Sequence, residues 1–175
     1  DDMADIKGES GGAAISQEGA PVLEAQDLCS SAGIKPFDFS IRRGEVNGFT
    51  GLLGSGRSEC VRAIFGADRV TGGHVKMDGQ NVKIKKPLDA MKQGIGYLPE
   101  DRKGDGIVGD LSVRENIILA YQVMKGFFRP ISRAQAEAFA DEYIKLLEIK
   151  TASSDTPIKS LSGGNQQKCI LARWL

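Results

Sequence analysis

The sequence predicts an α/β fold in two parts, a strand-rich part followed by a helical part. Short apolar or alternating runs, bounded by turn residues, fill residues 21–106. Within them the glycine-rich stretch "GLLGSGRSE", at 51–59, stands between an apolar run and a helical pattern. Over residues 107–175 the apolar residues recur at helical spacing. Residues 1–20 are rich in Gly, Ala, Ser and acidic residues without periodicity, so we expect a flexible leader there.

The composition is that of a globular chain without a strong overall charge. Of its 175 residues 41% are hydrophobic, which suffices for a packed core. Lys plus Arg and Asp plus Glu number 23 each, so no basic field favours nucleic acid as a partner. The three scattered cysteines, Cys29, Cys60 and Cys169, suit a reducing compartment and are expected to be small buried apolar residues. No run approaches the roughly 20 apolar residues of a membrane span, so any work at a membrane depends on partners.

The strand-rich part opens with two alternating runs, "VLEAQDL" at 22–28 and "FDFSI" at 37–41, which predict a hairpin with one buried side. We expect "VNGFTGLLG" at 46–54 to be a short strand that enters the glycine-rich stretch. The following "SECVRAIFG" at 58–66 predicts a helix, because its apolar residues have helical spacing and Gly66 provides a stop.

The rest of this part alternates again between extended and helical patterns. "GGHVKMDGQNVKI" at 72–84 predicts two short strands around the turn "DGQN", with His74 at the surface. "PLDAMKQG" at 87–94 predicts a short helix with Pro87 in its first turn. "IGYLPEDRKGDG" at 95–106 is expected to begin as a buried strand that stops at Pro99.

Three helices are expected in the second part. Ser112 with Glu115, and Ser132 with Gln135, have the spacing of capping boxes. The expected apolar stripes of these two helices are Val113, Ile117, Tyr121 and Met124, and then Phe139, Tyr143, Leu146 and Leu147. "SLSGGNQQKCILARWL" at 160–175 predicts a third, N-capped helix.

The glycine-rich stretch has most of the residues of a phosphate-binding loop. Such loops follow the spacing G-x-x-x-x-G-K-S/T, so that backbone N–H groups surround phosphate, a cation reaches the outer phosphates and a hydroxyl binds Mg²⁺. Gly51, Gly56 and Ser58 fit this spacing, whereas Arg57 stands in place of Lys. The alternative is a glycine-rich turn with a solvated Arg57. Because Arg keeps the charge but is larger than Lys, we expect binding to survive better than fast hydrolysis.

A second candidate anion site is "LSGGNQQ" at 161–167. A Ser followed by two glycines leaves the first N–H groups of a helix open to an anion. The alternative is an ordinary capped helix.

The stretches "GLLGSGRSE", "GIGYLPEDRKGDGI", "LSVRENI" and "LSGGNQQK", in this order, give the chain a family resemblance. It resembles the ATP-binding domain of ABC transporters, whose signature motif is LSGGQ. More narrowly, residues 21–175 resemble the C-terminal nucleotide-binding half of double-domain subunits in bacterial ribose, galactose and xylose importers. The resemblance implies a partial ABC-type P-loop nucleotide-binding domain, with a core lobe at 21–106 and a helical lobe with the signature helix at 107–175.

The resemblance also implies the ligands of both candidate sites. ATP would be held by Gly51, Gly54, Ser55, Gly56, Arg57, Ser58 and Glu59. Mg²⁺ would be bound by Ser58 and by Glu100, which stands in the place of the Q-loop Gln and whose charge Arg102 or Lys103 would offset. The alternative for "EDRK" is a solvated charged turn. A nucleotide bound to a partner domain would meet the signature residues Ser162, Gly163, Gly164, Asn165 and Gln166.

The implied function is to couple ATP binding and hydrolysis to sugar uptake. The implied partners are the N-terminal nucleotide-binding half of the subunit and the transmembrane permease, at the cytoplasmic face of the inner membrane. The alternative is a non-catalytic half, which binds ATP and supports domain closure while the N-terminal half hydrolyses.

Three departures from the family pattern qualify these expectations. "DLCSSAGIKP" at 27–36 offers no aromatic residue to stack adenine, and Asn47 needs a hydrogen bond if its strand is buried. The sequence ends at Leu175, before the family's Walker B strand, catalytic Glu and switch His. We therefore expect no catalytic residue in this chain, negligible ATP hydrolysis by it alone, and self-association through exposed sheet edges or apolar faces.

Overall fold

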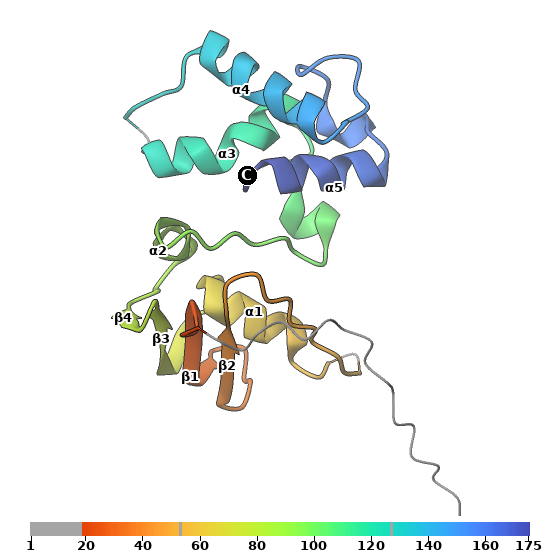
Figure 1. The fold of residues 1–175 in the computed structure, drawn as a ribbon. Helices are drawn as coiled ribbons and strands as arrows, with labels where there is room; N and C mark the ends of the chain where they lie inside the picture. Colours follow the sequence, from red (N-terminus) through yellow and green to blue (C-terminus); the bar gives the residue numbers. More distant parts are fainter. Residues whose placement is uncertain (1–18, 53, 127) are drawn as a thin grey trace, which may run out of the picture.

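The computed structural model describes residues 19–52, 54–126 and 128–175, so the predicted leader at 1–20 lies almost wholly outside the described residues. In Figure 1 the sheet and the helix after the glycine-rich stretch form a lower layer, and the helices within residues 113–172 form an upper layer. The elements in chain order are β1 Leu23–Ser30, β2 Phe37–Ile41, α1 Arg57–Phe65, β3 Val70–Met77, β4 Gln80–Val82, α2 Pro87–Lys92, a π-helical turn Arg102–Gly106, α3 Val113–Lys125, α4 Arg133–Leu146, a 3-10 turn Ile158–Ser160 and α5 Gly163–Ala172.

The sheet is antiparallel, with the strand order β2-β1-β3-β4. The predicted pairing of 22–28 with 37–41 is confirmed, with Leu23 opposite Ile41. The predicted turn between β3 and β4 is also confirmed, and Asp78 and Gly79 reverse the chain with positive φ angles. His74 is exposed on β3, as expected. Alternate residues of β1 are buried against α1, which gives the sheet one apolar face.

The first hydrophobic core, called the sheet core here, lies between this face and α1. It contains Leu23, Ala25, Leu28, Ala63, Ile64, Phe65, Val75, Ile84 and Ala90. The predicted helix at 58–66 is confirmed, and Gly66 ends it in the left-handed conformation. A Cβ on Gly66 would lie 2.7 Å from Ile84, so this position requires glycine for space as well as for conformation.

Two predicted strands are absent from the described residues, and both predictions were wrong. The segment 46–52 and the segment 95–98 are extended without strand pairing. The reason is that a strand needs a hydrogen-bonded neighbour, and the described residues provide none beside either segment. Val46 and Leu52 are 91% and 86% exposed. Asn47 accordingly lies at the surface, where its Nδ2 donates to the carbonyl of Ser40 at 3.0 Å.

The second hydrophobic core, called the helical core, lies between α3, α4 and α5. Its buried members are Val113, Ile117, Ala140, Ile149, Ile158, Cys169 and Ala172. Both predicted capping boxes are present at the starts of α3 and α4. The predicted stripes are only partly buried, because Tyr121 and Met124 are exposed at the distal end of α3, and Leu146 is 64% exposed.

The cysteine prediction is confirmed for one residue of three. Cys169 is buried in the helical core, and burial raises the pKa of its thiol to about 11. Cys29 and Cys60 are half-buried and free. In the part of the chain that the structure describes, no helix is long and apolar enough to cross a bilayer.

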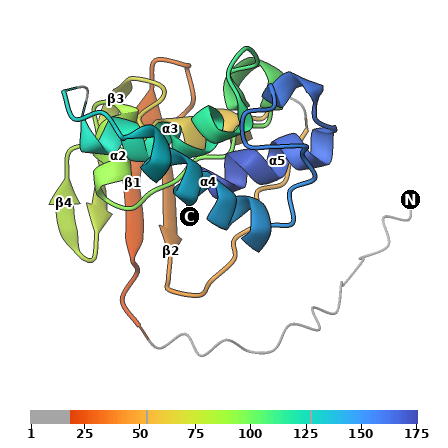
Figure 2. The same cartoon turned by 90° about the horizontal axis from the view of Figure 1, so that it is seen from above.

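The segment 93–112 and the end of α5 connect the two layers (Figures 1 and 2). Trp174 follows α5 and packs edge-to-face on Phe65 of the sheet core, with ring centroids 5.7 Å apart. Phe65 also stacks on Tyr97 of the connecting segment. The Trp174 contact fixes the end of α5 over the helix that follows the glycine-rich stretch.

Candidate functional site

The glycine-rich stretch ends directly at the N-terminus of α1. The N-cap residue is Gly56, with φ 90°, and no side chain caps the helix. Gly54 also has a positive φ, 79°, so the loop needs glycine at both positions. The N–H groups in the first turn of a helix have no intrahelical partner and carry the positive end of the helix dipole. This N-terminus is therefore built like an anion site.

Arg57 is the first residue of α1 and is half-buried. Within the described part of the chain, its guanidinium has neither a hydrogen-bond partner nor an ion-pair partner. Its position beside the open N-terminus leaves this charge available to an anion. The glycine-rich turn with a fully solvated Arg57, which the sequence left open, fits this geometry less well.

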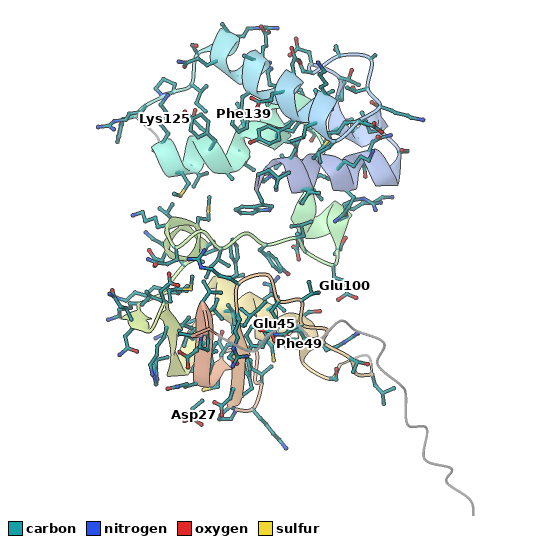
Figure 3. The ribbon with its side chains drawn as sticks, viewed as in Figure 1. Asp27, Glu45, Phe49, Glu100, Lys125 and Phe139 are labelled. Atoms are coloured by element: carbon teal, nitrogen blue, oxygen red, sulfur yellow. The ribbon has the colours of Figure 1, made fainter. Side chains whose placement is uncertain are left out.

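Ser58 and Glu100 lie together although 42 residues separate them in the sequence. The hydroxyl of Ser58 donates to Glu100 Oε2 at 2.7 Å. Glu100 lies in the segment that connects the two layers (Figure 3). The predicted pairing of these two residues at one site therefore has a structural basis, because α1 and the segment after Pro99 converge on the loop.

The oxygens of Ser58 and Glu100 fit a magnesium ion that is also bound to phosphate. Mg²⁺ prefers oxygen ligands and is held in proteins by one or two carboxylates together with substrate phosphates and water. A hydroxyl and a carboxylate at hydrogen-bond distance, next to an anion site, match this requirement. In the described residues no group of three or more His, Cys, Asp or Glu side chains gathers that could hold a metal without phosphate.

A groove adjoins the loop on the side of β2. It has a volume of about 440 Å³ and runs from Ala32 to Phe37 on one wall and from Gly54 to Cys60 on the other. Ile34, Pro36 and Phe37 supply apolar surface there. Burial raises the pKa of the Cys60 thiol, and the neighbouring Glu59 adds to this effect. The aromatic residue of this groove is Phe37, which directly follows the stretch 27–36 that has no aromatic residue.

The predicted signature residues form the turn that begins α5, called the signature turn here and comprising residues 161–166. Ser162 has N-cap geometry, but its hydroxyl does not cap a backbone N–H group. The Nδ2 of Asn165 donates to Ser162 Oγ at 2.9 Å, and Asn165 Oδ1 accepts from the N–H of Lys150. Ser162 Oγ thus accepts from Asn165 and not from the backbone, so no side chain caps the first N–H groups of α5.

Gln166 lies behind the signature turn and not on its outer face. It is 5% exposed, and its Nε2 donates to the carbonyls of Ile158 and Leu161. Its Oε1 accepts from Arg102 Nε at 3.0 Å. The expectation that Gln166 meets a nucleotide is therefore corrected, because all its polar atoms are used inside the chain. Arg102, which the sequence singled out only as an offset for Glu100, is part of this contact.

Comparison with known proteins explains why these features occur together. A family model described as "ABC transporter" matches residues 34–175. The chain belongs to the ABC transporter family. The resemblance stated from the motifs is thereby confirmed.

Curated members of the ABC transporter family extend the match to the sequence level. The chain is 45% identical over 155 residues to the fructose import ATP-binding protein FruK of Bifidobacterium longum, covering 89% of this chain and 30% of FruK. It is 46% identical to the galactofuranose transporter ATP-binding protein YtfR of Escherichia coli strain K12, covering 89% and 31%. The ribose import ATP-binding protein RbsA of Chelativorans is 42% identical, covering 90% and 31%. The chain thus spans less than a third of the length of these ABC transporter relatives.

Solved structures of ABC transporter cassettes share the fold. The ATP-binding cassette MJ0796, in a dimeric post-hydrolysis state with ADP and Pi, superposes with a TM-score of 0.67 at 21% identity, covering 87% of this chain and 68% of that one. A nucleotide-free cassette from an ABC transporter gives a TM-score of 0.66 at 19% identity, covering 89% and 65%. The predicted fold class, a partial α/β cassette, is confirmed, whereas a boundary at residue 106 stays a prediction.

Proposed function

We propose that this chain is part of the ATP-binding subunit of a bacterial sugar importer and holds Mg²⁺-ATP on the stretch 51–59. The observation that carries the proposal is the contact of Ser58 with Glu100 at the uncapped N-terminus of α1. Similarity to import ATP-binding proteins for fructose, galactofuranose and ribose supports the sugar class. The described residues contain no feature that selects one sugar.

Residues of this chain bind the phosphates, the Mg²⁺ and the base of the nucleotide at three adjoining places. The N–H groups of Gly54, Gly56 and Ser58 and the charge of Arg57 receive the phosphates. Ser58 and Glu100 bind Mg²⁺, which neutralises phosphate charge when bound. The groove with Ile34 and Phe37 accepts the base on apolar surface, so Phe37 supplies the aromatic contact that residues 27–36 lack.

The signature turn serves a nucleotide held by another domain. The N–H groups of Gly163 and Gly164, which no side chain caps, and the exposed Ser162 hydroxyl form the contact surface. The partner in this proposal is the N-terminal nucleotide-binding half of the same subunit. Permease subunits complete the assembly and keep the chain at the cytoplasmic face of the inner membrane. The exposed Val46 and Leu52 support the further expectation of self-association, which light scattering measures.

Isothermal titration of the chain with Mg²⁺-ATP tests this proposal. We expect saturable binding that Arg57→Ala weakens by about tenfold, which is the effect of losing one charge-assisted contact. Arg43→Ala removes the same charge from an exposed turn away from the loop and should bind like the unchanged chain. Absence of binding, or equal loss in both variants, contradicts the proposal.

A non-catalytic role of this site is the second candidate, and Arg57 is the observation that favours it. The planar guanidinium keeps the charge of the usual Lys but has a different shape, which affects transition-state contacts more than binding. Loss of ATP binding at this site in the full-length subunit with Arg57→Ala, without loss of turnover, would support this role. Equal loss of both would favour catalysis at this site.

The 175-residue chain itself is expected to hydrolyse ATP negligibly. Of the carboxylates in the described residues, Glu100 is the one that hydrogen-bonds the loop, and a carboxylate that ligates Mg²⁺ is not free to activate water. Phosphate release should therefore stay at the level of the Arg57→Ala variant. A steady rate well above that level contradicts the expectation.

A further inference from the structure

Arg102 links the segment of Glu100 to the signature turn. Its Nε donates to Gln166 Oε1 at 3.0 Å. Its guanidinium also lies against Gly163, where an added Cβ would come within 3.1 Å of Nη2. Gln166 in turn holds the carbonyls of Ile158 and Leu161. Arg102 therefore touches the first residue of α5 and the side chain that shapes the loop before it.

The connection from Glu100 to Arg102 is short and stiff. One residue, Asp101, separates them, and its carboxylate accepts from the N–H groups of Lys103 and Gly104. This cap fixes the start of the π-helical turn at Arg102–Gly106. A displacement of Glu100 is therefore passed to the backbone of Arg102 instead of being absorbed by a flexible loop.

The far end of the same turn is held independently of the Arg102 side chain. Arg173 Nη1 donates to the carbonyl of Gly106 at 2.8 Å, and Asp105 pairs with Arg62 of α1 at 3.5 Å. Arg62 is paired more closely with Asp68, at 3.0 Å. Removal of the Arg102 head group should therefore leave the turn folded and release only the signature turn from it.

The position of Arg102 is electrostatically unusual. A cation at a helix N-terminus is opposed by the helix dipole. Here the guanidinium lies on the first residue of α5, with Gln166 as its hydrogen-bond partner and no carboxylate in an ion pair within the described residues. An apolar side chain would fill the space beside Gly163 equally well. The charge and the directed Nε hydrogen bond of Arg102 therefore indicate that it orients the signature turn.

We propose that Arg102 is a positioning residue, which couples nucleotide binding at the phosphate loop to the conformation of the signature turn of the same chain. The inference rests on the proposed function, because it requires a magnesium nucleotide at 51–59. In the structure the Ser58 hydroxyl donates to Glu100. Ser58 and Glu100 would hold a magnesium ion through these same two oxygens, so their hydrogen bond would be lost and Glu100 would move relative to Ser58. Arg102 carries this shift to Gln166 and Gly163.

Hydrogen exchange of the signature turn with and without Mg²⁺-ADP tests the proposal. ADP has no γ-phosphate to reach the signature turn of a second chain. In the unchanged chain, bound nucleotide should change exchange at 161–166 by about threefold or more, as expected for a shift in local opening. Arg102→Met keeps the stem and removes the charge and donors; it should lose this response while its affinity for Mg²⁺-ADP stays within about threefold.

Arg43→Met is the matched control, because it removes the same charge and donors from an exposed turn outside both sites and should respond like the unchanged chain. If Arg102→Met fails to fold, Arg102→Lys serves instead, since it keeps the charge but lacks the Nε donor to Gln166 and should also lose the response. A full response in the variants of Arg102 overturns the inference, as does nucleotide binding without any response in the unchanged chain. Absence of binding to the unchanged chain overturns the proposed function and the inference with it.

Discussion

Helices of this chain begin in two different ways. At α3 and α4 the Ser side chain accepts the N–H of the residue three positions on, and Glu115 and Gln135 complete the boxes. At α1 and α5 the N-cap residues are Gly56 and Ser162, and no side chain caps the backbone. The packing helices α3 and α4 thus satisfy part of their own N–H groups, whereas α1 and α5, which begin at candidate anion sites, leave them open; the short α2 also lacks a side-chain cap.

The two open N-termini differ in how firmly hydrogen bonds within the chain fix their shape. The signature turn is surrounded by fixed polar groups, with Asn165 bound to Lys150 and Ser162, and with Gln166 buried beneath it. In the loop before α1, Gly51 and Leu52 are exposed, and among its described residues one internal backbone bond runs from the N–H of Ser55 to the carbonyl of Leu52. The chain therefore builds the shape of the signature turn by itself, whereas the phosphate loop depends more on its ligand for order.

The largest expected effect concerns the open N-terminus of α1. Ser58→Ala removes a hydroxyl that now donates to Glu100 and that would ligate magnesium. Affinity for Mg²⁺-ATP should fall by about 10- to 100-fold, since contacts to charged groups contribute about 1.5–3 kcal/mol. Isothermal titration with and without Mg²⁺ measures this.

The metal dependence separates a ligand role of Ser58 from a merely structural one. Without Mg²⁺ the variant and the unchanged chain should bind ATP with similar, weak affinity. An equal loss in both conditions would show that Ser58 supports the loop and not the metal.

The next largest effect concerns a capped N-terminus. Ser112 is buried, accepts the N–H of Glu115 and donates to its carboxylate at 2.6 Å. Ser112→Ala should lower the free energy of unfolding by about 1–2 kcal/mol, the upper part of the range for lost N-caps. Urea unfolding gives this value. Ser132→Ala, at an exposed box, is the matched control and should cost about half as much.

These capped helices were predictable because their signals are local. The spacing of Ser112 and Glu115 is sufficient for a capping box, and the glycines of the phosphate loop and signature turn mark the open N-termini in the same way. Such features depend on four to eight neighbouring residues, so no knowledge of the tertiary fold was needed.

Features that depend on distant residues were missed or misjudged. The predicted strand at 46–54 has apolar residues but no hydrogen-bonded neighbour in the described chain, and pattern alone does not supply one. The inward turn of Gln166 depends on Arg102, 64 residues away. The place of Phe37 in the groove depends on how β2 lies beside α1. Each of these is set by tertiary contacts that the periodicity does not contain.

A smaller effect is expected from acid at the capping box of α3. The hydrogen bonds from the Ser112 hydroxyl and then its backbone N–H lower the pKa of Glu115 below its ordinary value of 4.5. A lowered folded-state pKa contributes stability above pH 4.5 that is lost as the pH falls through the folded value. Unfolding free energy should therefore decline in this window by less than the cost of Ser112→Ala. Glu115→Gln should flatten this part of the decline, and an unchanged slope would contradict the assignment.

The smallest effect is expected at the open N-terminus of α5. It tests whether α5 differs from the capped helices α3 and α4. Ser162 is exposed, and its hydroxyl accepts from Asn165 Nδ2 and not from the backbone. Ser162→Ala should therefore change the free energy of unfolding by less than about 0.5 kcal/mol, since no cap is lost. Asn165 keeps its bond to Lys150, so the turn retains its shape. A loss as large as that of Ser112→Ala in the same urea series would mean that Ser162 caps α5 in solution, and its N-terminus would then not be open to an anion.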